Sequence, residues 1–234
     1  MNLITYNIIN DQQDKLKLAA RIACNFWNYF LIPKLPIILS LDIFKSNNNI
    51  IAKATRPDQI NNVIEGNVKY NIKFLNIQDT KVIAGTLIHE IGHILGFGSG
   101  NNWTKLFYGK THQKAGQFLE LYIEKLPELK QMQVEMNEGS FGTLFKHWDE
   151  EIFDQELMTG FKDSAEYVLP ITIKIMSLFG HILKIENQLQ SKTSLNELIN
   201  KVAVLEFSEN HKLISNQLKE QITTGKHFED IISI

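Results

Sequence analysis

The sequence predicts an α+β protein with a small twisted mixed sheet, a long first helix, a second helix that follows the strands, and a helical C-terminal part. Apolar residues recur at helical spacing over residues 11–31 and again over residues 80–95. Two or three strand-like segments lie between these helices. After residue 186 the apolar positions indicate amphipathic helices.

The first helix is expected to begin at Asp11, because this carboxylate and that of Asp14 favour the positive end of a helix dipole. Pro33 and Pro36 end it near residue 31. Cys24 lies within the helix and is most simply a small packing residue. It is also the only cysteine, so no disulfide can form within the chain.

Three segments between the two helices read as strands. Residues 37–44 form an apolar, β-branched run, and residues 46–49 give a turn signal. Residues 50–55 are expected to return as a paired strand. Residues 68–74 alternate between apolar and polar side chains, which indicates a half-buried strand.

The second helix is expected over residues 80–95, where Gly96 ends it. Further helices are expected over residues 115–126 and 171–183, with a glycine-containing loop at 139–145. This order suggests an N-terminal subdomain over 1–100, a C-terminal subdomain over 101–185 and a helical extension over 186–234.

Composition narrows the function classes. The 234 residues are 44% hydrophobic and 21% charged, which is typical of a globular protein. The formal net charge of −2 gives no basic excess for binding nucleic acid. No apolar run approaches the roughly 20 residues of a membrane span, and the first residues do not resemble a signal peptide. We expect a soluble protein, most simply a monomer.

The chemistry is concentrated in His89-Glu90-Ile91-Gly92-His93, within the second predicted helix. Positions four apart lie on one face of a helix, so His89 and His93 can both bind one zinc ion. Glu90 can then reach a zinc-bound water as a general base. The alternative to a zinc site is an ordinary helix on which one of these histidines is a core residue and the other a surface residue.

A catalytic zinc needs a third protein ligand. The compact spacing would place it at position 99, which is Ser99, so His147 is the best candidate. Glu120 or Glu124 would take this role in a gluzincin arrangement. The other histidines lack convergent partners and are expected at the surface or in packing positions: His112, His181, His211 and His227.

At this point the chain resembles the leishmanolysin-like metzincin metallopeptidases of bacterial type. The resemblance covers residues 11–185 and depends on the 89–97 motif, a glycine-rich loop at 139–143, His147-Trp148, and Glu156-Leu157-Met158-Thr159-Gly160. It implies the metzincin fold, one catalytic zinc held by His89, His93 and His147, and Glu90 as general base. It also implies that Met158 forms a hydrophobic floor near the metal, with Gly96 ending the zinc helix.

The resemblance therefore implies a zinc endopeptidase that hydrolyses protein substrates, with residues 161–170 walling a substrate pocket. We expect the substrate to pair with an edge strand at 68–74. Residues 149–151 are expected on a solvated face. Export without a cleaved leader is favoured over a cytoplasmic location. A non-catalytic zinc-binding module is the alternative from another class. Zinc would be the chain's only evident cross-link, so chelation should lower stability.

Overall fold

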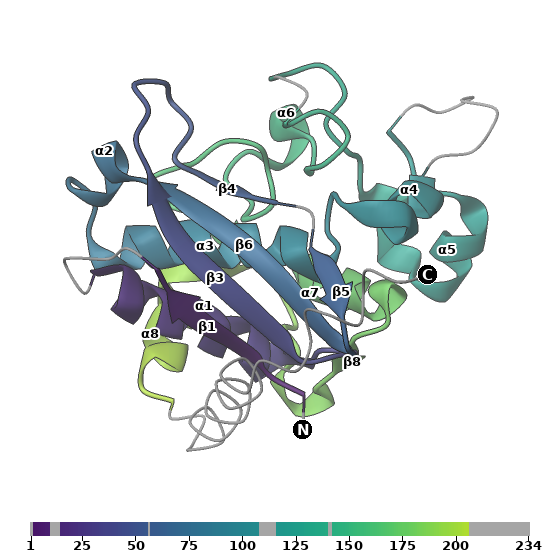
Figure 1. Cartoon of the computed structure of the whole chain (residues 1–234). Coiled ribbons are helices and arrows are strands. Elements are labelled where there is room, and N and C mark those ends of the chain that lie inside the picture. The colour runs from purple at the N-terminus through teal and green to yellow at the C-terminus, as the bar shows by residue number, and fades with distance from the viewer. Residues whose placement is uncertain (1, 10–14, 56, 108–115, 140–141, 206–234) are drawn as a thin grey trace, which may run out of the picture. The chain divides into compact units, whose positions relative to one another are not determined.

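A mixed sheet carries two long helices on one of its faces in the computed structural model (Figure 1). The structure describes residues 2–9, 15–55, 57–107, 116–139 and 142–205. Met1–Ala203 forms one unit and Val204–Ile234 a second. Within the described residues, no helix is long and apolar enough to cross a membrane. The α+β class with a small mixed sheet is confirmed.

The sheet has five strands, of which three are parallel in the order β1-β3-β6. Two short strands, β4 and β5, both pair antiparallel with β6. The strand predicted at 37–44 is confirmed to the residue. β1 was not predicted; its five residues form a shorter run than any of the three segments that read as strands. The bounds are β1 Ile4–Ile8, β3 Ile37–Phe44, β4 Ala52–Ala54, β5 Asp58–Ile60 and β6 Val63–Asn71.

The paired strand expected at residues 50–55 is confirmed as β4, whose partner is β6. The position of β6 itself corrects one expectation. The strand expected at 68–74 ends at Asn71, continues into the short helix α2 (Ile72–Leu75), and lies inside the sheet, not at its edge. The cause is a tight hairpin: Asn61 and Asn62 adopt φ values of 47° and 62° and return the chain from β5 directly into β6. The edge on this side is therefore β4 and β5.

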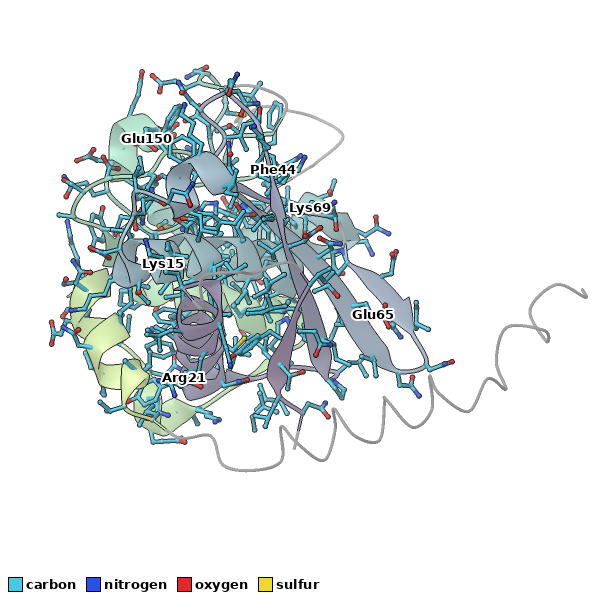
Figure 2. The ribbon with its side chains drawn as sticks, turned by 60° about the vertical axis from the view of Figure 1, so that its left-hand side comes forward. Lys15, Arg21, Phe44, Glu65, Lys69 and Glu150 are labelled. Atoms are coloured by element: carbon cyan, nitrogen blue, oxygen red, sulfur yellow. The ribbon has the colours of Figure 1, made fainter. Side chains whose placement is uncertain are left out.

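The alternation of buried and half-buried side chains along the strands shows which face of the sheet the helices cover. On β3, Ile37, Leu39 and Leu41 are buried and the residues between them are half-buried. Figure 2 shows Glu65 and Lys69 of β6 on the face turned away from the helices. The apolar face packs on α1 (Lys15–Phe30) and α3 (Thr80–Leu95), the second of which is confirmed to the residue.

Helix α1 is tied to its neighbours by buried polar side chains. Asn28 donates to the Ile4 carbonyl and accepts from the Ile4 amide, both at 2.9 Å, which joins α1 to β1. The Trp27 indole donates to the Ile88 carbonyl of α3 at 2.9 Å. Cys24 is 1% exposed, so its predicted packing role is confirmed. The helix start expected at Asp11 lies outside the described residues.

The C-terminal half is built from short elements. The helix expected over 115–126 is observed only as α5, and the helix expected over 171–183 is wrong beyond residue 174. There the chain tightens into a 3-10 turn, Gly180 takes a φ of 94°, and residues 182–183 form a strand.

The helices are α4 Gly100–Phe107, α5 Glu120–Lys125, α6 Glu150–Phe153, α7 Pro170–Lys174 and α8 Leu195–Ala203. The 3-10 turns are η1 Pro127–Gln131, η2 Ile175–Phe179 and η3 Ile185–Asn187. The small strand pairs are β2 Leu31–Ile32 with β8 Ile182–Leu183, and β7 Tyr167–Val168 with β9 Thr193–Ser194.

His181 locks the end of α3 to the segment after α1, which confirms its predicted packing role. It is 4% exposed. Its Nδ1 accepts from the Lys34 amide at 3.2 Å, so its Nε2 carries the proton and donates to the Leu95 carbonyl at 2.8 Å. Burial is the main cause that lowers the pKa of His181. The imidazole is therefore neutral in the folded protein.

This arrangement predicts a pH-dependent contribution to stability. At pH 7.5, His181→Ala is expected to lower the free energy of unfolding by about 1–3 kcal/mol, because two buried backbone groups lose their partner. The difference should shrink at pH 5, since the unfolded wild type gains a proton near pH 6.5 that the folded imidazole resists. Urea unfolding of the wild type and of His181→Ala, both in the presence of a chelator, measures the free energy of unfolding at the two pH values. An equal difference at both pH values would contradict it.

Candidate metal centre

Helix α3 presents the first two histidines of the centre. The Asp79 carboxylate caps its N-terminus, accepting from the amides of Lys81 and Val82 at 2.8 and 3.0 Å. Gly96 ends it with a φ of 120°, a conformation that glycine adopts without strain. His89 and His93 lie one turn apart on the same face near this end. Local sequence signals therefore fix both ends of the helix that carries the motif.

His147 reaches the same place from a segment far along the chain. Its Nε2 lies 3.2 Å from Nε2 of His89 and 3.1 Å from Nε2 of His93, and the latter two atoms are 3.0 Å apart. His147 is buried, at 6% exposure. The structure thus brings together the three histidines that the sequence analysis singled out.

The other ring nitrogen of each histidine faces a backbone carbonyl. His89 Nδ1 lies 2.7 Å from the Leu157 oxygen, His93 Nδ1 lies 2.9 Å from the Phe97 oxygen, and His147 Nδ1 lies 2.9 Å from the Thr143 oxygen. A carbonyl only accepts, so each neutral imidazole carries its proton on Nδ1. The Nε2 lone pairs then point at one another, and no hydrogen bond can form among them.

Burial keeps these imidazoles neutral. It is the main cause that lowers the pKa of His93 to about 4 and that of His147 to about 3. Burial also places the pKa of His89 well below its usual value, and the other two histidines lower it further. Neutral imidazoles are the form that binds metals, so the site is ready to bind a cation at neutral pH.

The donor set fits a metal ion such as zinc. Two imidazole nitrogens bound at about 2.0–2.1 Å to one tetrahedral zinc lie ~3.3 Å apart. The observed separations of 3.0–3.2 Å are close to this value. Three convergent lone pairs without a proton between them repel, and a cation at their meeting point removes the repulsion. Imidazole also binds copper, nickel and iron, so geometry alone does not select zinc.

Glu90 follows the first histidine but does not join the triad. It is 8% exposed, and its carboxylate receives a backbone hydrogen bond from Ala54 of β4. Burial raises its pKa to about 7, against the effect of that hydrogen bond. A carboxyl group with such a pKa can both take up and release a proton near neutral pH.

Met158 and two glycines set the close contacts around the triad. Met158 is fully buried, and its Sδ lies 2.9 Å from where a Cβ on Gly92 would stand. Gly98 has a φ of 63°, and a Cβ there would lie 2.1 Å from the Lys146 carbonyl oxygen. The segment that carries His147 therefore approaches the end of α3 through the space that Gly98 leaves.

Other candidate residues lie elsewhere. Glu120 and Glu124 are exposed on α5 and belong to no group of metal-binding side chains found in the described residues. Ser99 donates to the His93 carbonyl at 2.6 Å. His112, His211 and His227 lie outside the described residues. The solvated face expected for 149–151 is wrong for Asp149, which is 8% exposed because it caps α6 by accepting from the Ile152 amide.

The groups that support the three histidines leave little signal in the sequence. Three of them are backbone carbonyls, which no side-chain pattern reveals. Gly98 stands in a glycine-rich stretch that reads only as a helix end. Glu156 lies in the Glu156–Gly160 motif, but nothing in the sequence indicates its own contacts.

The contrast between Gly98 and Gly100 gives a direct test. Both have positive φ, but a Cβ on Gly100 would meet no atom within 4 Å. Gly98→Ala is expected to lower cobalt affinity at least tenfold and to destabilise the protein more than Gly100→Ala, which adds only backbone strain of about 1 kcal/mol. Cobalt titration and urea unfolding measure both effects. Equal behaviour of the two variants would contradict the assigned role of Gly98.

Comparisons with models of known protein families, with curated proteins and with solved structures find no match for this chain. The function must therefore be inferred from the site itself. Its defining features are three convergent imidazole nitrogens and one buried carboxyl group on the helix that carries two of them.

Proposed function

We propose that this chain is a zinc-dependent metalloendopeptidase of the leishmanolysin-like metzincin type. The observation that carries the proposal is the convergence of His89, His93 and His147 through Nε2, with every Nδ1 facing a carbonyl. Three protein ligands leave one position open, as in catalytic zinc sites, whereas structural sites use four.

When bound, zinc supplies a Lewis acid that lowers the pKa of water and polarises the scissile carbonyl. Glu90 accepts the proton of the attacking water on its carboxylate, for which a pKa near 7 is well matched. The protonated Glu90 then donates this proton to the leaving nitrogen. No covalent bond between chain and substrate is required.

The edge strand β4 offers backbone for an extended substrate. The Asn71 amide donates to Ile51 and the Thr55 amide donates to Asn67, so odd-numbered residues of this edge face β6. The backbone groups of Ala52 and Ala54 therefore point away from β6. The Ala54 amide already donates to Glu90, so a peptide that adds to this edge through the Ala52 backbone groups and the Ala54 carbonyl would lie beside the general base.

The segment after Met158 supports a pocket wall on the other side of the helix. Lys162 and Glu166 form an ion pair, and Lys162 Nζ lies 3.0 Å from where a Cβ on Gly85 would stand. Gly85 precedes His89 by one helical turn on the same face. Lys162 and Glu166 thus border the face of α3 that carries His89, which supports a role for residues 161–170 as a pocket wall.

Replacing the proposed base tests the reaction. Glu90→Gln is expected to keep one zinc per chain but to lower kcat for hydrolysis of a proteome-derived peptide library by about 10²–10⁴-fold, because the amide cannot accept the proton. Glu124→Gln, a change of an exposed glutamate, should behave as the wild type. Mass spectrometry of the products and metal analysis provide both readouts.

Three outcomes would contradict the proposal. Hydrolysis by Glu90→Gln at the wild-type rate would remove Glu90 from the reaction. Zinc binding by the wild type without cleavage of any peptide would instead favour the non-catalytic zinc-binding module. Loss of zinc in Glu124→Gln would favour the gluzincin arrangement.

A further inference from the structure

A fully buried glutamate lies in the turn that carries Met158. Glu156 is 0% exposed. Its Oε2 accepts from the Met158 amide at 2.6 Å, and its Oε1 accepts from the Leu169 amide at 3.0 Å and from the Thr172 hydroxyl at 2.6 Å. All three partners are donors, so the carboxylate is matched as an acceptor on both oxygens.

The burial of this group is costly. Desolvation is the main cause that raises its pKa to about 7, against the three donors. A buried carboxyl group contributes nothing to packing that an apolar side chain of similar size would not provide better. The reason for burying Glu156 must therefore lie in the groups that its carboxylate hydrogen-bonds.

The contacts of Glu156 continue to the histidine ligands. The Met158 amide that it binds belongs to the peptide group whose carbonyl is that of Leu157, and this carbonyl accepts from His89 Nδ1 at 2.7 Å. The Met158 carbonyl accepts from the Trp148 amide at 3.0 Å, one residue after His147. Fixing one peptide plane thus orients one ligand and ties down the segment of another.

A second chain of hydrogen bonds links Glu156 to the segment that carries His147. The Trp148 indole donates to the Thr172 hydroxyl at 2.9 Å. An indole N–H only donates, so the hydroxyl must direct its own proton to Glu156. Trp148 is therefore linked to Glu156 through its indole and the Thr172 hydroxyl, and to Met158 through its backbone amide.

We propose that Glu156 is a positioning residue of the metal centre, which fixes the Leu157–Met158 peptide and thereby orients the imidazole of His89 and the segment of His147. This inference rests on the proposed metal-binding function, but not on peptide hydrolysis. Groups that orient metal ligands typically change metal affinity by 10–100-fold when they are lost.

Glu156→Gln tests the inference in the full chain. An amide has only one acceptor oxygen, so it cannot satisfy donors on both sides as the carboxylate does. We expect a folded protein by circular dichroism, a zinc Kd raised about 10–100-fold, and a shifted visible spectrum of the cobalt-loaded protein. Glu156→Met, which removes all acceptors, should have a larger effect; if it does not fold, Glu156→Gln alone decides.

Asn28→Ala is the control, because Asn28 is also a fully buried polar side chain, but its hydrogen bonds join α1 to Ile4 of β1 and do not reach the Met158 turn. It should lower stability while leaving zinc Kd and the cobalt spectrum unchanged. Equal zinc Kd and equal spectra for Glu156→Gln and wild type would overturn the inference. A wild type that binds zinc without hydrolysing peptides would refute only the proposed peptidase activity.

Discussion

Three hydrogen bonds between imidazole Nδ1 atoms and backbone carbonyls are the constraint on which the candidate centre depends. The carbonyls come from separate segments: Leu157 in the turn before Met158, Phe97 two residues after the end of α3, and Thr143 in the loop before His147. Each bond fixes a tautomer and a ring orientation, and only together do they aim three Nε2 lone pairs at one point. The short elements of the C-terminal half thus matter to the chemistry as much as helix α3 does.

One physical cause, burial, prepares both kinds of group for their roles. It disfavours the charged form of His93 and His147, which leaves them as neutral ligands, and it disfavours the charged form of Glu90, which brings its pKa to about 7. The same burial therefore raises the pKa of the proton acceptor, Glu90, and lowers the pKa values of the histidine ligands.

The sequence predicted what is encoded locally. Helix α3 and strand β3 were predicted to the residue, because a C-terminal glycine that ends a helix and an apolar, β-branched run are signals that act over a few positions. The inner place of β6 was not predictable, since strand order depends on which partners pair. The break after Lys174 and the carbonyls beneath the histidines depend on tertiary contacts, which leave no pattern in the side chains.

X-ray absorption at the zinc edge of the zinc-loaded protein tests the central claim most directly. The geometry predicts one zinc per chain with three imidazole nitrogens and no sulfur in its first shell, at about 2.0–2.1 Å. In His147→Ala the number of imidazoles should fall by one. A sulfur ligand in the wild type, or an unchanged number of imidazoles in His147→Ala, would contradict the assignment of His89, His93 and His147 as the metal-binding set.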